Sequence, residues 1–383
     1  MFDRSISTAK IRVVGVGGAG SNAINSMIES GVNADFYAVN TDRQSLGLSI
    51  AENKIQIGEE VAQGLGAGSD PDLGRRAAEE SIGVLEEMCE GVKLLFIAAG
   101  MGGGTGTGAA PVIAKIAKEK GCLTVAVVTK PFAFEGKKRQ ENAEIGLDDL
   151  KKYVDMLIVV PNAKLVQTLP VDTTMLSAFK IADDYLRMGV SGIVDLINTP
   201  SLINLDFADL RTIIQNQGIA HMGRGRAKGE GRILEAMRKA VSSPLLETTI
   251  EGAHHVIINI TGGTDLTLGQ VDEAAGLVRN VVADSANIIF GTNINPDLNG
   301  EVDITIIATG FGANEEAESA QSAAAKGNPK QALDMLMGVN VKQEEFDLPP
   351  QKNPDRNGRR ESENDEDDGM PSFAKKYLGG NRN

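Results

Sequence analysis

The stretch that most constrains the fold of this chain is Gly-Met-Gly-Gly-Gly-Thr-Gly-Thr-Gly, at residues 100–108. An apolar run at residues 94–99 precedes it, and residues 109–117 after it have helical spacing. The order is therefore a buried strand, a glycine-rich loop and the first turn of a helix. Glycines let backbone N–H groups approach a ligand, and a helix N-terminus adds unpaired N–H groups and a positive dipole end. With the hydroxyls of Thr105 and Thr107, this loop predicts a phosphate-binding site.

A second glycine-rich segment, Gly-Val-Gly-Gly-Ala-Gly, occupies residues 15–20. It lies between an apolar strand at residues 11–14 and a helical stretch at residues 21–29, which is the order of a dinucleotide-binding loop. Such a site also needs an acidic residue at the end of the next strand, but the strand at residues 36–39 ends at Asn40. Two phosphate-binding loops suit a nucleoside triphosphate better, and the chain has no P-loop motif. A nicotinamide-dependent oxidoreductase is the alternative that the segment at residues 15–20 would support by itself.

Apolar strands alternate with helices through the first half of the chain. Strands are expected at residues 123–128 and 156–160, and helices at residues 72–89 and 140–150. This alternation predicts an α/β fold with a Rossmann-like parallel sheet that is covered on both faces. Because ligands of such sheets bind at the carboxyl ends of the strands, we expect five segments to meet at one edge. They are residues 15–20, 40–42, 100–108, 129–135 and 161–162.

A long helix is expected at residues 172–198, with Asp172 as its cap. At 1.5 Å per residue it would extend about 37 Å, which suits a link between two domains. Its apolar positions follow steps of three, four and seven residues and form one stripe. The stripe consists of Leu176, Phe179, Leu186, Val190, Ile193 and Ile197.

The domain division follows from these elements. We expect a nucleotide-binding domain at residues 1–171, the central helix at 172–198 and a smaller α+β domain at 199–312. In the α+β domain, strands are expected at residues 254–260, 287–290 and 303–308, and helices at residues 231–241 and 268–282.

Two further segments follow the α+β domain. Residues 313–369 are polar and acidic, which predicts a disordered linker, and residues 370–383 form a terminal peptide. In that peptide, Phe373 and Tyr377 would face one partner groove on a helical turn.

Composition excludes several classes of protein. The net charge of −14 over 383 residues argues against nucleic acid as the main partner. The N-terminal residues show no signal peptide, and no apolar run reaches the ~20 residues that span a bilayer. Cys89 and Cys122 have no metal-binding spacing and indicate a reducing compartment. We therefore expect a cytoplasmic protein without direct membrane insertion, and we assign no metal-binding residues.

At four motifs the chain resembles the FtsZ family, the bacterial relatives of tubulin. The motifs are the glycine stretch at residues 100–108, Gly-Val-Gly-Gly-Ala-Gly-Ser-Asn at 15–22, Pro-Phe-Ala-Phe-Glu-Gly-Lys-Lys-Arg at 131–139 and Asn-Leu-Asp-Phe-Ala-Asp at 204–209. The resemblance covers residues 10–311 and, again, the terminal peptide. It implies the tubulin/FtsZ fold, with a GTPase domain, a long central helix and a smaller C-terminal domain. It further implies a GTP-dependent filament that forms the cytokinetic ring at the inner face of the membrane at the bacterial division site.

The resemblance also implies roles for individual residues. Glu135 and Arg139 would lie beside the ribose and phosphate, and Asn162 near the sugar. Asp183 would bind the base, because a carboxylate can accept both hydrogens of guanine's N1–H and N2–H edge, which adenine does not offer. Phe179 would either stack on the base or belong to the apolar stripe. Around the phosphates and sugar would lie Gly18, Ala19, Gly20, Ser21, Asn22, Gly102, Gly103, Gly104, Thr105, Gly106 and Thr107.

The motif at residues 204–209 allows two interpretations. Asp206 and Asp209 are spaced like an N-cap and a first-turn acid, so the residues by themselves favour a structural role. In the family, however, this loop projects onto the nucleotide of the next subunit, so that Asn204, Asp206 and Asp209 would be catalytic. The two carboxylates could orient an attacking water, and Mg²⁺ would offset the phosphate charge.

Partners and one further alternative follow from the same resemblance. We expect head-to-tail protofilaments that bind GTP and GDP, and membrane-tethering and regulatory division proteins that dock on residues 370–378. A nucleotide-binding assembly protein that does not hydrolyse its nucleotide remains the other alternative, and the carboxylates at residues 206 and 209 speak against it.

Overall fold

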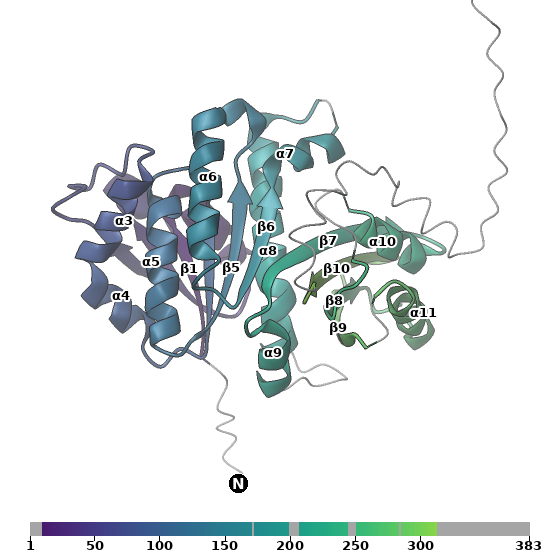
Figure 1. The fold of residues 1–383 in the computed structure, drawn as a ribbon. Helices are drawn as coiled ribbons and strands as arrows, with labels where there is room; N and C mark the ends of the chain where they lie inside the picture. The colour runs from purple at the N-terminus through teal and green to yellow at the C-terminus, as the bar shows by residue number, and fades with distance from the viewer. Residues whose placement is uncertain (1–9, 171, 199–206, 244–249, 283–284, 312–383) are drawn as a thin grey trace, which may run out of the picture. The chain divides into compact units, whose positions relative to one another are not determined.

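One mixed β-sheet runs through the residues that the computed structural model describes, which are 10–311 without 171, 199–206, 244–249 and 283–284 (Figure 1). Its ten strands follow the order β3-β2-β1-β4-β5-β6-β7-β10-β8-β9. The first six strands are all parallel, which confirms the predicted α/β fold. They are β1 (Ile11–Val16), β2 (Asp35–Asn40), β3 (Asn53–Gln56), β4 (Leu94–Gly100), β5 (Leu123–Lys130) and β6 (Met156–Pro161).

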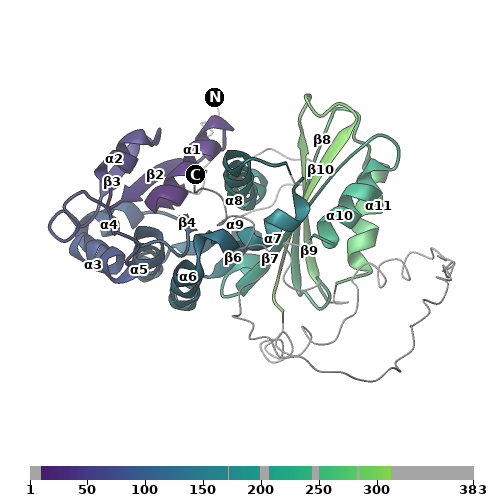
Figure 2. The ribbon, with the colours of Figure 1, turned by 90° about the horizontal axis from the view of Figure 1, so that it is seen from above.

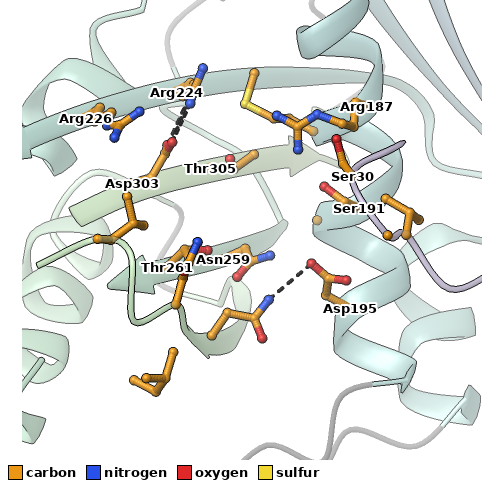
Figure 3. Close-up of a pocket in the computed structure, with 18 residues that line it drawn as sticks. Ser30, Arg187, Ser191, Asp195, Arg224, Arg226, Asn259, Thr261, Asp303 and Thr305 are labelled. Carbon is orange, nitrogen blue, oxygen red and sulfur yellow. Dashed lines mark hydrogen bonds and ion pairs between the residues drawn. The ribbon is translucent and has the colours of Figure 1, made fainter. Parts of the chain in front are cut away.

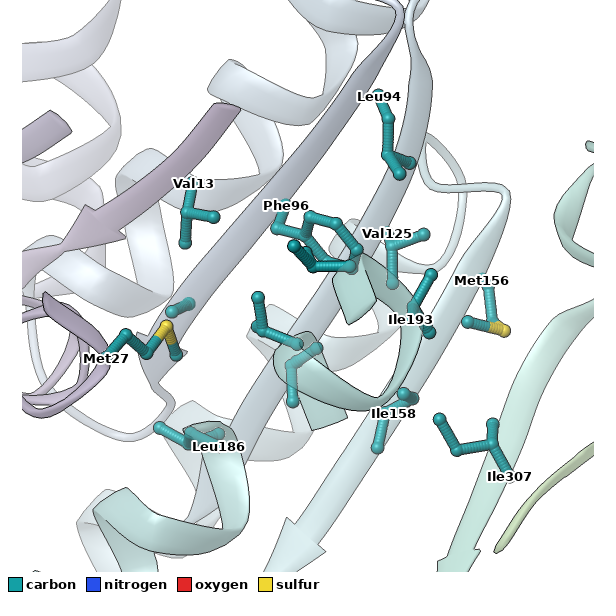
Figure 4. Packing of buried hydrophobic residues seen from close by; sticks show 14 of the residues in the cluster. Val13, Met27, Leu94, Phe96, Val125, Met156, Ile158, Leu186, Ile193 and Ile307 are labelled. Carbon is teal, nitrogen blue, oxygen red and sulfur yellow. The ribbon is translucent and has the colours of Figure 1, made fainter. Parts of the chain in front are cut away.

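Both faces of this parallel part are buried. In β4, Leu94 and Phe96 belong to one hydrophobic cluster, whereas Leu95 and Ile97 belong to a second cluster on the other face. This alternation has the period of two that a strand imposes on its side chains. Figure 4 shows part of the first cluster, and Figure 2 shows α1 and α8 on one side of the sheet with α5 and α6 on the other. The helices are α1 (Gly17–Glu29), α2 (Arg43–Leu48), α3 (Pro71–Glu80), α4 (Ile82–Cys89), α5 (Thr105–Glu119), α6 (Lys137–Leu150) and α7 (Asn162–Leu165).

The long helix α8 spans Met175–Asn198 and begins three residues later than expected. Thr174, and not Asp172, precedes its first turn, and the Thr174 Oγ1 accepts the N–H of Ser177 at 3.2 Å. Leu186, Val190 and Ile193 lie in the first cluster, which also contains Ile257, Ile289 and Ile307 of the C-terminal strands. The helix therefore joins the two halves of the fold through one core.

The predicted apolar stripe is wrong over the first turns of α8. Leu176 is 68% exposed and Phe179 is 40% exposed, so neither belongs to the core. Periodicity by itself cannot distinguish a buried position from an exposed one at this end of the helix.

The C-terminal half continues the same sheet. Strand β7 (Gly218–Lys228) pairs in parallel with β6 over three residues and antiparallel with β10 (Glu301–Thr309), which in turn pairs with β8 (His255–Gly262). The edge strand is β9 (Asn287–Ile294). Helices α10 (Arg232–Val241) and α11 (Leu268–Arg279) pack on one face over a third cluster, and α9 (Phe207–Ile214) precedes β7. Gly225 permits this packing, because a Cβ there would lie 1.8 Å from the Ala236 carbonyl oxygen.

Several elements differ from the sequence expectations. The helix expected at residues 72–89 is divided at Ser81 into α3 and α4. Strands β3 and β7 were not predicted, and the last predicted helix ends at Arg279. The linker at 313–369 and the peptide at 370–383 lie outside the described residues. Among the helices that the structure describes, none is long and apolar enough to cross a bilayer.

Candidate functional site

The two glycine loops lie against each other at the carboxyl ends of β1 and β4. These strands are neighbours, so the helices that follow them, α1 and α5, begin side by side. A Cβ on Gly17 would lie 3.0 Å from the Gly106 nitrogen, and a Cβ on Gly100 would lie 2.6 Å from the Ala19 Cβ. The structure thus brings residues 17–22 and 100–107 together at one place.

The first turns of α1 and α5 leave their N–H groups without a side-chain cap. Val16 and Gly104 hold the N-cap positions, and neither first turn contains an acidic residue. The neighbouring helices α2 and α3 are capped by Asp42 and Asp70, whose carboxylates accept backbone N–H groups at 2.8 Å and 3.0 Å. Two uncapped helix N-termini that face one place, with no carboxylate in either first turn, form a site for an anion.

The glycines of the two loops divide into those that packing requires and those that it does not. Gly104 and Gly106 are required by packing, because a Cβ there would lie 2.7 Å from the Ala67 Cβ and 2.6 Å from the Gly100 carbonyl oxygen, respectively. A Cβ on Gly103 would meet no described heavy atom within 4 Å, and a Cβ on Gly18 of the first loop would meet only the Ser45 Oγ, at 3.7 Å. Packing inside the described chain does not explain the last two glycines, whereas the approach of a ligand to the backbone would.

Two buried polar atoms at this edge have no hydrogen-bond partner in the described part of the chain. They are the Oγ of Ser21, which is 2% exposed, and the Oδ1 of Asn162, which is 5% exposed. Ser21 lies in α1, and Asn162 opens α7 after β6. Buried polar atoms are almost always hydrogen-bonded, so these two atoms are candidates for contact with a bound molecule. Asn22, the next residue of α1, is exposed.

The two threonines of the second loop have different partners. The Thr107 Oγ1 accepts the N–H of Gly102 at 2.8 Å and thereby holds the turn of the loop itself. The Thr105 Oγ1 lies 2.7 Å from the Oγ1 of Thr41, which follows β2. Gly102 has φ +103°, a conformation that side chains rarely adopt, and a Cβ there would lie 2.7 Å from the Arg139 carbonyl oxygen.

Residues 63–70 form a further wall of the site that the sequence analysis missed. The carbonyl oxygen of Gly64 accepts the N–H of Arg43 at 3.0 Å, and Gly66 donates its N–H to the Thr41 carbonyl at 3.3 Å. Ser69 has φ +64°, and its carbonyl accepts the side-chain amide of Asn142 at 3.2 Å. The signal was available, because Gly-Leu-Gly-Ala-Gly precedes Ser-Asp-Pro and a helix, which resembles the order of the other two loops.

Asn40 has a local structural role in place of the expected acid. Its Oδ1 accepts the N–H of Asp42 at 3.2 Å, and its Nδ2 donates to the Ser45 Oγ at 3.2 Å. Both ends of this buried side chain are used inside the turn after β2, so the strand ends in an amide and not in the carboxylate with which a dinucleotide site holds a ribose. The carboxylate of Asp42 in the same turn caps α2.

Glu135 and Arg139 lie together at the start of α6. Their side chains form an ion pair at 2.5 Å, and the second carboxylate oxygen of Glu135 accepts the N–H of Phe132 at 2.9 Å. The carboxylate is therefore fixed relative to the turn after β5, while the guanidinium remains exposed and available to a phosphate.

Phe179 joins a cluster of aromatic rings at the same edge. Its ring lies edge-on to Phe132, with centroids 5.2 Å apart, and to Phe134, with centroids 6.4 Å apart. Because Phe179 is 40% exposed, the core interpretation of this residue is wrong, and its ring remains open to a flat partner.

Asp183 lies one turn after Phe179 on α8 and is half-buried. Burial, and then the neighbouring carboxyl of Asp184, raises the pKa of Asp183 to about 7. No donor of the described chain forms a hydrogen bond with this carboxyl, so its charge is uncompensated. A ligand that brings two N–H groups would favour the ionised form.

The acidic motif at residues 204–209 is only partly described. Asn204 and Asp206 lie outside the described residues, whereas Asp209 is an exposed residue in the first turn of α9. Figure 1 shows α9 at the opposite end of the strands from α7, and α8, at about 36 Å, extends between these ends. The structure therefore does not bring Asp209 to the glycine loops of its own chain.

A separate cavity of about 440 Å³ lies between α8 and the C-terminal strands (Figure 3). Arg224 and Asp303 form an ion pair on one side of it, and Asn293 donates its amide to Asp195 of α8 at 3.1 Å on another. Burial raises the pKa of Asp195, and the bond from Asn293 opposes that shift. No residue of the two glycine loops lines this cavity.

The glycine-loop edge, with a parallel sheet beneath it, defines a class of nucleotide-binding proteins that hold phosphates on two helix N-termini. Residues 10–170 match the Tubulin/FtsZ family, GTPase domain, and residues 218–312 match the FtsZ family, C-terminal domain. The chain belongs to the FtsZ family of tubulin-like GTPases.

Solved structures agree with this assignment. An FtsZ dimer, empty, from M. jannaschii is 44% identical, with a TM-score of 0.76 over 79% of this chain and 88% of that one. A mutant FtsZ from the same organism is 43% identical, with a TM-score of 0.77 over 80% and 92%. A GTPgS-bound protofilament of CetZ2 from Haloferax volcanii is 22% identical, with a TM-score of 0.66 over 82% and 98%, and shares the fold.

Proposed function

We propose that this chain is a GTP-dependent filament protein that hydrolyses GTP at the junction between two subunits and forms the cytokinetic ring of a dividing bacterial cell. One observation carries the proposal. The two uncapped helix N-termini form an anion site without an acid in either first turn, while Asp209 lies at the far end of α8. A nucleotide held at one end of a subunit would meet such a carboxylate only in a head-to-tail neighbour.

Guanine selectivity rests on Asp183 and Phe179. The uncompensated carboxyl of Asp183 can accept both N–H groups of guanine's edge, and the exposed ring of Phe179 can cover the base. The phosphates would lie on residues 18–22 and 102–107, with Ser21, Glu135, Arg139 and Asn162 toward the sugar and phosphates.

Hydrolysis of GTP requires a polarised water that attacks the γ-phosphorus from the side opposite the GDP leaving group. Asp209, with Asn204 and Asp206 of the same motif, would orient that water from the next subunit. The described residues contain no group of three acidic, histidine or cysteine side chains that could hold a metal. Mg²⁺ would offset the charge of the phosphates, and in nucleotide sites it is usually held by substrate phosphates, water and one or two carboxylates.

Self-association, which the head-to-tail arrangement requires, is supported by relatives. One similar structure is an FtsZ dimer and another is a CetZ2 protofilament, so self-association occurs within this fold. The proposed localisation is the cytoplasm, at the inner face of the membrane at the division site. Membrane-tethering and regulatory division proteins would dock there on residues 370–378 through Phe373 and Tyr377.

The two alternatives receive less support. An oxidoreductase would need a ribose-binding acid after β2, and Asn40 stands there with its amide engaged in the turn. A protein that binds nucleotide without hydrolysing it would need no carboxylate in the exposed first turn of α9.

One experiment tests the proposal directly. Light scattering and phosphate release would be followed together on addition of GTP, with GDP and NADH as controls, at increasing protein concentration. We expect scattering with GTP alone, and phosphate release per subunit that rises from near zero above a threshold concentration. A release rate per subunit that is constant at all concentrations would show that each subunit hydrolyses GTP alone and would refute the shared site.

A further inference from the structure

Thr41 is a buried threonine whose hydroxyl faces the second glycine loop. It follows β2 and is 0% exposed, and its Oγ1 lies 2.7 Å from the Oγ1 of Thr105, the first residue of α5. Its carbonyl oxygen accepts the N–H of Gly66 at 3.3 Å. The residue thus links the turn after β2, residues 63–70 and the start of α5.

The direction of the hydrogen bond between the two hydroxyls depends on the partners available to them. Among the described residues, the Thr41 hydroxyl has no acceptor other than the Thr105 Oγ1. Either hydroxyl can donate in this hydrogen bond, and the proton of the other one then has no acceptor in the described chain. Thr105 is 9% exposed and Thr41 is 0% exposed, so only the proton of Thr105 can reach a bound molecule, and a bound phosphate would favour Thr41 as the donor.

The surroundings of Thr105 point to that acceptor. Thr105 lies in the uncapped first turn of α5, where the N–H groups and the helix dipole favour an anion. The other threonine of the loop, Thr107, already accepts the N–H of Gly102 with its Oγ1. The proton that Thr105 can donate is thus placed where a phosphate oxygen would accept it.

We propose that Thr41 is a positioning residue for nucleotide binding, which donates its hydroxyl proton to Thr105 and so keeps the proton of Thr105 directed at a phosphate oxygen. The inference rests on the proposed function, because it needs a nucleotide at the two glycine loops. It adds a residue from outside both loops that never touches the ligand. Loss of the Thr41 hydroxyl would let Thr105 rotate or present a lone pair to the phosphate.

The test uses the full chain and a fluorescent GTP analogue at protein concentrations below the assembly threshold. Thr41→Val keeps the shape and removes the hydroxyl, and we expect about tenfold weaker binding, as for one hydrogen bond to a charged group. Thr41→Ser keeps the hydroxyl and should bind within about twofold of the unchanged chain. Thr124→Val is the matched control, because Thr124 is also 0% exposed but donates to the Cys122 carbonyl at 3.2 Å, at the opposite end of the strands.

A double-mutant cycle separates positioning from a general structural effect. If Thr41 acts through Thr105, then Thr41→Val should add no further loss in a Thr105→Val background. Thermal melting without nucleotide checks the fold, and Thr41→Ala takes the place of Thr41→Val if the valine variant does not fold. Unchanged binding by Thr41→Val, or by Thr41→Ala where that variant takes its place, would overturn the inference, as would losses that add in the cycle. Absence of GTP binding in the unchanged chain would instead refute the proposed function.

Discussion

The two ends of α8 differ in the chemistry that they present. At its N-terminal end lie the glycine loops, two uncapped helix N-termini and a half-buried carboxyl at Asp183. At its C-terminal end, α9 opens with the exposed carboxylate of Asp209. The first end has no acid in the first turn of either helix and can bind a phosphate chain, whereas the second presents an exposed acid in the first turn of α9. Under the proposed function, binding would belong to one end of the chain and hydrolysis to the other, so the two can be tested separately.

The largest expected effect comes from Asp209→Ala. Nucleotide binding should be unchanged, because Asp209 lies far from the glycine loops of its own chain, while GTP turnover should fall about 100-fold with the loss of an oriented water. Phosphate release and nucleotide affinity would be measured on the same preparation, with Asp148→Ala, an exposed acid of α6, as the control.

Mixtures of Asp209→Ala with Asp183→Ala sharpen the same comparison. At a GTP concentration that Asp209→Ala binds and Asp183→Ala does not, neither variant should turn over GTP by itself, but their mixture should, because Asp209 of one variant then meets the nucleotide that the other holds. No recovery in the mixture would place the catalytic acid within the subunit that binds the nucleotide.

Asp183→Ala should act at the other end only. Loss of two hydrogen bonds to the guanine edge should weaken GTP about 30-fold, while ATP, which lacks that edge, should change little. A filter-binding titration with both nucleotides checks this. Equal losses for GTP and ATP would mean that Asp183 supports the site without contacting the base.

Gly103→Ala and Gly104→Ala separate ligand approach from packing in one loop. Gly103→Ala should melt like the unchanged chain but bind GTP about tenfold more weakly, because its Cβ meets no described atom and would enter the path of the ligand. Gly104→Ala should lower the free energy of unfolding by about 1–3 kcal/mol, because its Cβ would lie 2.7 Å from the Ala67 Cβ. Thermal melting and GTP binding would be measured for both variants. An equal loss of stability in the two would contradict this division.

The smallest effect is the pH dependence of GTP binding. The pKa of Asp183 is raised to about 7 in the nucleotide-free protein, and guanine favours the ionised carboxylate. Affinity should therefore increase as the pH rises toward 7 and level off above it, with a gain of at most about tenfold between pH 6 and pH 8. Asp183→Asn should lose this part of the profile, while titration of the phosphates remains in both proteins. An identical profile in the variant would exclude Asp183 as its source.

Much of the fold could be predicted because its signals are local. The strands β1, β4, β5 and β6 are short apolar runs bounded by glycine loops or polar turns, and burial on both faces requires this pattern. Strand β7 was missed because glycine and arginine alternate along it, and its stability comes from pairing with β6 and β10, which are distant in the sequence. The exposed start of α8 was missed because Leu176 and Phe179 continue the apolar spacing of the buried stripe, although both side chains are exposed.

The candidate site divides in the same way. Its two loops could be predicted because the glycines and the following helices are contiguous in the sequence. The wall at residues 63–70 and the roles of Thr41 and Asn142 depend on contacts between segments up to 73 residues apart. The raised pKa of Asp183 likewise depends on burial, which cannot be determined from the sequence of the helix alone.

The position of β10 has a consequence for synthesis on the ribosome. In chain order it is the last strand described, yet it lies between β7 and β8 and pairs with both. The six parallel strands pair only with one another until β7 is made, so their part of the sheet can form as it emerges. The C-terminal half must instead keep the edges of β7 and β8 unpaired until residues 301–309 have been translated. A nascent chain stalled before that point would expose two open strand edges, which are the surfaces that chaperones protect and that aggregates use.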